Sequence, residues 1–153
     1  MNAYTRVWPE TGECPLFLEK ENVPIFLEVV AGALFDADGR VLIAQRPVGK
    51  ALAGRWEFPG GKLHDGEDAR AGLVRELREE LGVEVHDAER LIRYSHAYPE
   101  RVVRLDLWLV KSWSGKARSL DGQALKWVKP EDLGFEDMLE ADQPMIDALL
   151  ART

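Results

Sequence analysis

The stretch GKLHDGEDARAGLVRELREELGV, residues 61–83, decides the fold. It opens with a polar loop, and a helical pattern follows from about Asp68 to Leu81. Aspartate is a good N-cap, because its carboxylate accepts an unpaired backbone N–H of the first turn. Gly82 suits the position after the helix, because glycine tolerates the left-handed conformation that ends helices. The sequence therefore predicts a helix whose two ends are both defined.

This helix has an apolar face and a separate acidic face. Apolar residues four positions apart share one side of a helix. They are Ala69, Leu73, Leu77 and Leu81, with Val74 beside them. Glu76, Glu79 and Glu80 fall on another arc, where like charges three and four residues apart repel. The acidic cluster is either a solvated face paired with Arg75 and Arg78, or a site for Mg²⁺, which prefers oxygen ligands.

The spacing of the whole stretch favours the metal site. Gly61 is followed after five residues by Glu67, and after seven more by Arg75-Glu76-Leu77. Glu79-Glu80 and Gly82-Val83 complete a pattern that resembles the Nudix box at every defined position. The resemblance extends to MutT-like Nudix hydrolases through three further segments and covers roughly residues 29–150. Those segments are Ala44-Gln45-Arg46-Pro47, Leu52–Lys62 and Tyr98-Pro99-Glu100-Arg101.

The resemblance implies a fold, a cofactor and a set of metal ligands. Nudix hydrolases are α/β/α sandwiches with a mixed sheet, and they cleave a nucleoside diphosphate linked to another moiety with Mg²⁺, or in some cases Mn²⁺. The family pattern assigns metal-binding roles to Glu76, Glu79, Glu80 and the Gly60 carbonyl, with Glu67 supporting the metal directly or through Arg75. It gives structural roles to Arg75, Gly61 and Gly82.

The general base stays open between two kinds of candidate. Glu76 or Glu79 could take the proton of the attacking water while the other glutamates, Glu80 among them, hold metal. Asp121 is the second candidate, because MutT-like enzymes carry an acidic residue at this position on a loop that faces the metals. Its alternative interpretation is a plain Asp-Gly turn.

Four further residues are candidates for the substrate. Arg46 and Arg101 match nucleotide contacts of MutT-like proteins, and a guanidinium can bind phosphate through two parallel hydrogen bonds. Either could instead be a surface arginine. Phe58 would pack on the base or sugar, unless it is a core aromatic like Trp56. Lys62, next to the glycine turn, could neutralise phosphate.

Asp142 departs from the family pattern, which has Asn at this position. An Asn amide offers a donor and an acceptor to an oxidised guanine, whereas an ionised Asp only accepts. Asp142 would accept from the N1–H and amino group of guanine but could not donate to O6. It is also a good N-cap type for the last helix. This departure leaves the preference for 8-oxoguanine open.

Composition restricts the class of protein. A chain of 153 residues is long enough for one domain with a real core. The net charge of −7 argues against a nucleic-acid polymer as partner. Cys14 is the single cysteine, so an internal disulfide is excluded. We expect no membrane association and a cytoplasmic location, because the sequence has neither a membrane-length apolar run nor a signal peptide pattern.

Along the chain, residues 1–24 are expected to be an extension that packs on a sheet edge or forms a dimer contact, with a short strand at Leu16-Phe17-Leu18. A single domain then occupies residues 25–153, as a monomer or homodimer. Strand-like runs cover residues 25–35, 41–45, 56–58, 88–96, 102–111 and 125–128. The first two are expected to form a hairpin around Asp36–Gly39. A last helix starts near Asp142, with Met145, Leu149 and Leu150 on its apolar face.

The leading hypothesis is a Mg²⁺-dependent nucleoside triphosphate pyrophosphohydrolase that releases a nucleoside monophosphate and pyrophosphate. The expected substrate is 8-oxo-dGTP first and a pyrimidine triphosphate such as CTP or dCTP second, which would make the enzyme a nucleotide-pool sanitiser. A rival enzyme would cleave ADP-ribose or a dinucleoside polyphosphate, but the extra motifs of those subfamilies are not seen. A nucleotide-sensing module without catalysis would typically lose a box glutamate, and all are intact here.

Overall fold

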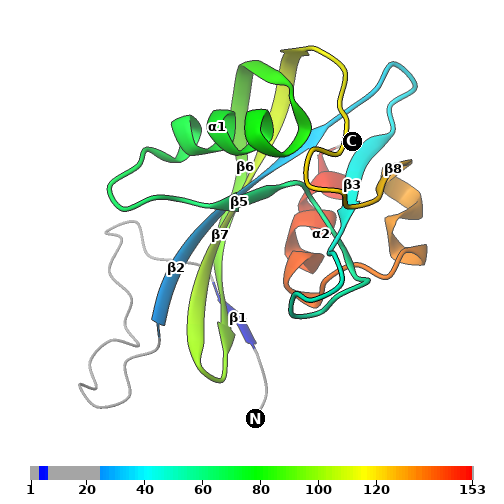
Figure 1. Ribbon diagram of the computed structural model, residues 1–153. Coiled ribbons are helices and arrows are strands. Elements are labelled where there is room, and N and C mark those ends of the chain that lie inside the picture. The colour runs from blue at the N-terminus through cyan, green and yellow to red at the C-terminus, as the bar shows by residue number, and fades with distance from the viewer. Residues whose placement is uncertain (1–3, 7–24, 153) are drawn as a thin grey trace.

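The structure, a computed structural model, describes residues 4–6 and 25–152. In these residues the chain forms two sheets with α-helices against them (Figure 1). The five-stranded sheet has the order β1 (Tyr4–Arg6), β6 (Glu84–Tyr98), β7 (Arg101–Ser114), β2 (Ile25–Leu34) and β5 (Gly60–Lys62). The three-stranded sheet has the order β4 (Trp56–Glu57), β3 (Val41–Gln45) and β8 (Leu125–Val128). The helices are α1 (Ala69–Leu81), α2 (Gln143–Ala151) and the 3₁₀ segments η2 (Pro130–Phe135) and η3 (Glu140–Asp142).

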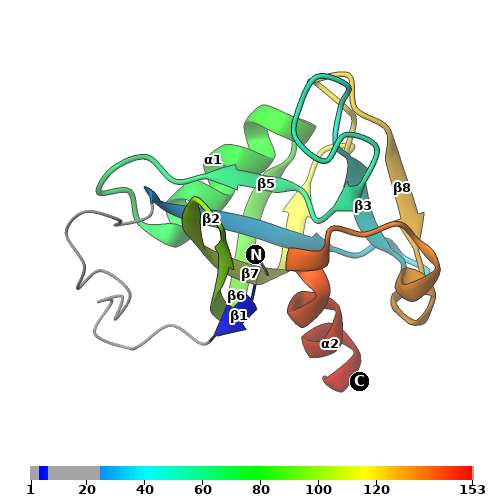
Figure 2. The same cartoon turned by 90° about the horizontal axis from the view of Figure 1, so that it is seen from below.

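The large sheet is mixed, because β2 runs parallel to β7 while the other pairs are antiparallel. Successive side chains of a strand point to opposite faces. Val30 and Leu34 pack into the core under α1, whereas Ala31 and Ala33 pack into the core that includes α2. Figure 2 shows α1 and α2 on opposite sides of this sheet. The predicted mixed sheet between helices is confirmed.

The ends of α1 are those that the sequence predicts. The Asp68 carboxylate accepts a hydrogen bond from the Ala71 backbone N–H at 3.1 Å. Gly82 has φ 71°, in the left-handed region, and its N–H donates to the Arg78 carbonyl. Leu73, Leu77 and Leu81 are fully buried against the sheet. The apolar face therefore fixes the rotation of the helix and turns its glutamates away from the core.

The predicted hairpin of β2 and β3 is wrong. The Asp36–Gly39 turn is present, with the Asp36 carboxylate accepting from the Asp38 and Arg40 N–H groups, but the two strands belong to different sheets. Only the isolated bridge between Phe35 and Val41 joins them. Both edges of β2 are already occupied by β5 and β7, so the chain leaves the sheet at the turn.

The glycine turn before α1 also differs from the prediction. The strand expected over residues 56–58 ends at Glu57, and Gly60–Lys62 forms a strand of its own on the edge of the large sheet. A Cβ at Gly60 would lie 2.0 Å from the Val30 carbonyl oxygen. The two backbones approach this closely because Gly60 has no side chain. Glycine here permits strand pairing instead of preventing it.

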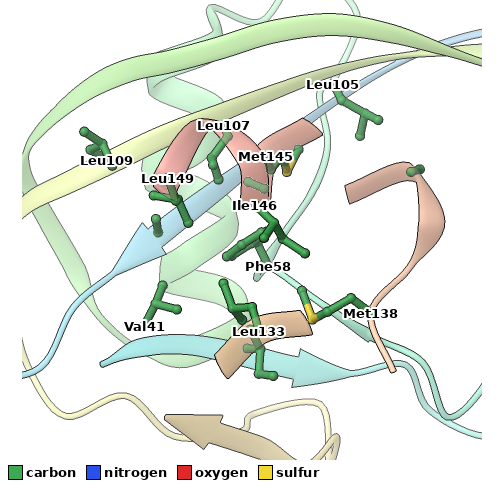
Figure 3. Close-up of a cluster of buried hydrophobic side chains, with 14 of the residues drawn as sticks. Val41, Phe58, Leu105, Leu107, Leu109, Leu133, Met138, Met145, Ile146 and Leu149 are labelled. Atoms are coloured by element: carbon green, nitrogen blue, oxygen red, sulfur yellow. The ribbon is translucent and has the colours of Figure 1, made fainter. Parts of the chain in front are cut away.

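Two of the predictions concern side chains of the core that includes α2. Met145, Ile146 and Leu149 of α2 are buried, but Leu150 is 42% exposed and lies off the apolar face. Figure 3 shows Phe58 among side chains from β7, α2 and η2. Its ring is 3% exposed. The alternative interpretation of Phe58 as a core aromatic therefore describes its ring in this structure.

The segment before β2 is described only at residues 4–6, where β1 pairs with β6 at the edge of the large sheet. The strand predicted at Leu16–Leu18 and the environment of Cys14 lie outside the described residues. Across the part of the chain that the structure describes, no helix is long and apolar enough to span a membrane.

Candidate active site

Arg75 holds three glutamates at the outer face of α1. Its Nε donates to Glu67 at 2.8 Å, and its Nη1 donates to Glu76 at 2.9 Å and to Glu79 at 3.1 Å. Its Nη2 bonds a second Glu67 oxygen and the Lys62 carbonyl. These bonds from Arg75 lower the pKa of Glu67 to about 2. The guanidinium therefore offsets the repulsion among the carboxylates that the sequence alone leaves unexplained.

Glu80 is held differently, by neutral donors. One carboxylate oxygen accepts from the Gly60 N–H at 3.3 Å, and the other accepts from the Gln123 side-chain amide at 2.9 Å. Burial raises the pKa of Glu80 to about 7, and the negative charge of Glu57 adds to the shift. Glu80 is thus the box glutamate that accepts a hydrogen bond from the backbone of the glycine turn.

The glycine turn lies directly against the glutamates. A Cβ at Gly61 would lie 2.2 Å from a carboxylate oxygen of Glu76. Gly61 thus leaves room for the Glu76 carboxylate, whereas a side chain at Gly60 would collide with the backbone of β2. The absence of a side chain at Gly61 therefore lets this backbone lie directly against the acidic cluster.

Asp121 and Lys62 lie on segments that are bonded to α1. Among the described residues, neither side chain forms a hydrogen bond or ion pair with the box glutamates. Asp121 is exposed, and it follows Leu120, whose N–H donates to the Glu80 carbonyl at 3.1 Å. The loop of Asp121 is therefore attached to the last turn of α1. The Lys62 side chain is exposed, while its carbonyl accepts from Arg75.

Asp142 lies in a second, buried part of the site. Its carboxylate is 5% exposed and accepts from the Phe58 backbone N–H at 3.2 Å. Burial raises the pKa of Asp142 to about 7, and the charge of Glu57 contributes to the shift. The residue stands at the N-cap position of α2, but its side chain makes no capping bond there. The interpretation of this carboxylate as a helix cap is therefore wrong.

Arg46 lies between these two parts and is tied to the chain around it. Its Nη1 donates to Glu57 at 3.1 Å, and its Nε donates to the Ala51 carbonyl at 2.7 Å. Glu57 has a raised pKa because it is buried. Its charge acts on both Glu80 and Asp142, and Arg46 acts on Asp142. Arg46 is thus not a free surface arginine. Its bonds to Glu57 and Ala51 leave only part of its guanidinium available to a phosphate.

Arg101 belongs to the part of the site that holds Asp142. Its guanidinium lies over the ring of Tyr98, 5.5 Å from the ring centroid. Burial raises the pKa of Tyr98, and the charges of Asp142, Arg101 and Arg46 also act on that hydroxyl. These residues come from three separate segments of the chain, and their charges act on Tyr98 in the folded protein.

A model described as the NUDIX domain matches residues 30–148. The chain belongs to the Nudix family. It is 40% identical over 125 residues to the CTP pyrophosphohydrolase of Escherichia coli K12, covering 82% of this chain and 92% of that protein. It is 44% identical over 126 residues to the putative 8-oxo-dGTP diphosphatase 2 of Mycobacterium tuberculosis, covering 82% and 88%.

The fold of this Nudix enzyme is similar to that of solved relatives. The solution structure of the E. coli ORF135 protein matches with a TM-score of 0.75 at 38% identity, covering 84% of this chain and 91% of that one. The match supports the mixed α/β Nudix fold described above. With relatives of both names at comparable identity, the protein is a MutT-like Nudix hydrolase.

The donor set of the Nudix box fits a hard divalent cation. Carboxylate and carbonyl oxygens are the ligands that Mg²⁺ prefers, and Glu76, Glu79, Glu80 and Gly60 supply them on one side of α1. Within residues 25–152, no three acidic, histidine or cysteine side chains already form a closed cluster. The carboxylates are instead held by Arg75, Gln123 and the Gly60 N–H, and the Glu79 side chain is 59% exposed.

Three residues of this region were not singled out from the sequence. They are Glu57, Tyr98 and Gln123. Glu57 is a charged residue between two aromatic ones, and this pattern could have indicated a buried functional carboxylate. Gln123 carries no such signal, because its contact with Glu80 joins residues 43 positions apart.

Proposed function

We propose that this Nudix hydrolase cleaves nucleoside triphosphates to a nucleoside monophosphate and pyrophosphate with Mg²⁺, taking 8-oxo-dGTP first and CTP or dCTP second. The observation that carries the proposal is the division of the site into two ends. Box glutamates and the glycine turn lie at one end, and the buried Asp142 carboxylate lies at the other. Arg46 and Glu57 connect the two ends.

The glutamate end is suited to the phosphates. Glu76, Glu79, Glu80 and the Gly60 carbonyl would hold the cation, which when bound shields phosphate oxygens and lowers the pKa of the attacking water. Arg75 keeps Glu67, Glu76 and Glu79 oriented when the cation binds. Proton removal from the water belongs to Glu76, Glu79 or Asp121.

The Asp142 end is suited to the base. A buried acceptor favours a ligand that presents a donor, and leaving it unpaired costs roughly 1–3 kcal/mol. The N1–H and amino group of guanine, or the amino group of cytosine, supply such a donor, whereas the edge of uracil fits poorly. The names of the two relatives, one for CTP and one for 8-oxo-dGTP, support the same pair of candidates.

Arg46 and Arg101 are proposed to hold the nucleotide between these ends. Arg46 already donates from Nε to Ala51 and from Nη1 to Glu57, so its Nη2 is the nitrogen that we propose contacts a phosphate. Lys62 adds a nearby positive charge. In this arrangement the glutamates act on the phosphates while Asp142 selects the base.

The test is a panel of nucleotides with Mg²⁺, in which pyrophosphate and phosphate release are measured separately. We expect pyrophosphate from 8-oxo-dGTP and from CTP, at the highest kcat/KM values of the panel, and slow cleavage of UTP. ADP-ribose and a dinucleoside tetraphosphate serve as rival substrates. Faster cleavage of either rival than of every triphosphate would overturn the proposal.

A further inference from the structure

We infer that Gln123 is a positioning residue that fixes the Glu80 carboxylate for a divalent cation and anchors the loop carrying Asp121. The inference rests on the proposed metal-dependent function and names a further residue for it. It starts from the side-chain amide of Gln123, which is 9% exposed and donates to a Glu80 oxygen at 2.9 Å.

The orientation of this amide is determined by its two partners. The Ser119 hydroxyl donates to the Gln123 amide oxygen at 2.9 Å. An ionised carboxylate can only accept, so the NH₂ group must face Glu80 and the oxygen must face Ser119. The Glu80 carboxylate therefore sets which way the amide faces, and the Ser119 hydroxyl, which can donate or accept, holds the amide oxygen in that position. The chain of bonds continues through Glu80 to the Gly60 N–H at 3.3 Å.

The backbone around Gln123 is attached to the same helical turn that carries Glu80. The last carbonyls of an α-helix lack partners within the helix. Here the Arg118 N–H donates to the Leu81 carbonyl and the Leu120 N–H donates to the Glu80 carbonyl, both at 3.1 Å. At the other end of the loop, the Ala124 carbonyl accepts from the Gln45 N–H at 2.9 Å, where β8 begins. Asp121 therefore lies on a segment held on both sides.

The two donors that hold Glu80 are neutral, and they affect its carboxylate differently from a lysine or arginine side chain. Among the described residues, Arg75 forms ion pairs with Glu67, Glu76 and Glu79, and no lysine or arginine forms an ion pair with Glu80. The Gly60 N–H and the Gln123 amide orient the Glu80 carboxylate without neutralising its charge. That charge stays available to an incoming cation, and groups that orient a ligand in this way typically raise metal affinity.

The experiment measures Mn²⁺ binding to the full chain by calorimetry, without nucleotide. Gln123→Leu keeps the volume and removes the amide, so its Mn²⁺ affinity should fall roughly 10- to 100-fold. The Mg²⁺ concentration needed for half-maximal turnover should rise by a similar factor, with a smaller loss of kcat at saturating Mg²⁺. Ser119→Ala keeps the amide but frees its orientation, and should weaken binding less.

The matched control is Gln143→Leu. Gln143 also donates from its amide to a carboxylate, that of Asp147 at 3.0 Å, on the exposed side of α2. Removing this bond should leave Mn²⁺ affinity unchanged. If Gln123→Leu does not fold, Ser119→Ala decides. Native Mn²⁺ affinity in the folded variants, with only a lower Tm, would overturn the inference alone. A native chain that binds no Mn²⁺ would overturn the proposed function together with it.

Discussion

The two ends of the site hold the same chemical group in opposite ways. At the outer face of α1, Arg75 binds Glu67, Glu76 and Glu79, and its bonds hold the pKa of Glu67 at about 2. In the interior, burial raises the pKa of Asp142 to about 7, and Glu80, which lies at the glutamate end but is held by neutral donors, shares this rise. The first arrangement keeps Glu67 ionised at any physiological pH, and the second makes the charge of the buried carboxylates depend on what binds beside them.

This difference separates two tasks. The bonds from Arg75 hold Glu67, Glu76 and Glu79 in position and offset their mutual repulsion, which suits ligands that must lie close together around a cation. A buried carboxylate near its pKa is stabilised strongly by a cation or by a donor of the substrate. Glu80 would respond to the metal and Asp142 to the base, and Glu57 lies where its charge acts on both.

The largest expected effect comes from the glutamate end. Glu79→Gln and Glu80→Gln keep the helix but remove a charge from the proposed metal ligands, so each should lower kcat at least about 100-fold. Because Glu80 is partly buried and has a raised pKa, its Gln variant should melt at the native temperature or above it. Turnover at saturating Mg²⁺ and thermal melting measure both effects. Near-native turnover in the two variants would show that this end does not hold a catalytic metal.

The next effect concerns substrate choice at the buried end. Asp142→Asn keeps an acceptor for the Phe58 N–H and adds a donor, so the ratio of kcat/KM for 8-oxo-dGTP over CTP should rise roughly 10-fold. Asp147→Asn, on the outer side of α2, is the matched control and should leave the ratio unchanged. Asp142→Ala leaves the Phe58 N–H without its acceptor and should lower both selectivity and Tm. An unchanged ratio in the Asn variant would remove Asp142 from base selection.

A smaller effect is expected where the two ends meet. Arg46→Ala should raise KM for the triphosphate about fivefold, more than it lowers kcat, if the contact contributes ~1 kcal/mol equally in ground and transition states. Glu57→Gln leaves Arg46 in place and loosens its ion pair, so KM should stay level or fall. A lower Tm without a change of KM in Arg46→Ala would restrict Arg46 to a structural role.

The smallest effect is the pH dependence of stability without metal. The pKa of Asp142 rises from its ordinary value of 3.8 to about 7 in the folded chain, where Glu57, Arg46 and Tyr94 surround it. Between these values the folded state keeps a proton that the unfolded state has lost, so stability falls as pH rises from 4 to 7. In urea unfolding, the fall should be less steep in Asp142→Asn by about 1 kcal/mol per pH unit. Equal slopes would contradict the buried, protonated carboxylate.

The same division explains what the sequence could predict. The glutamate end depends on local rules: helical periodicity places Leu73 and Leu77 inward, and Asp68 and Gly82 define the ends. Charged residues within one helix are visible from spacing alone. The family resemblance supplied the metal chemistry and the general architecture.

The buried end depends on contacts between distant segments. Asp142 and Phe58 are 84 positions apart, so a good N-cap residue type indicated a cap that is not made. The hairpin prediction failed for the same reason: the local turn is present, but neighbouring strands from elsewhere in the chain decide where β3 pairs. The strand at Gly60–Lys62 was not predicted, because the close approach of Val30 cannot be known from sequence.

The strand of Gly60 has a further consequence for how the molecule meets its neighbours. The large sheet ends in β5 on one side and β1 on the other, and each spans three residues. A short edge strand offers few unpaired backbone groups of its own to a strand of another chain, although β6 and β2 extend beyond the residues that β1 and β5 pair. The residues that bring the backbone to the glutamates thus also limit the sheet. A side chain at Gly60 would collide with the Val30 carbonyl and shift the backbone carbonyl that is proposed to bind the metal, and a longer strand there would offer more unpaired groups to another chain.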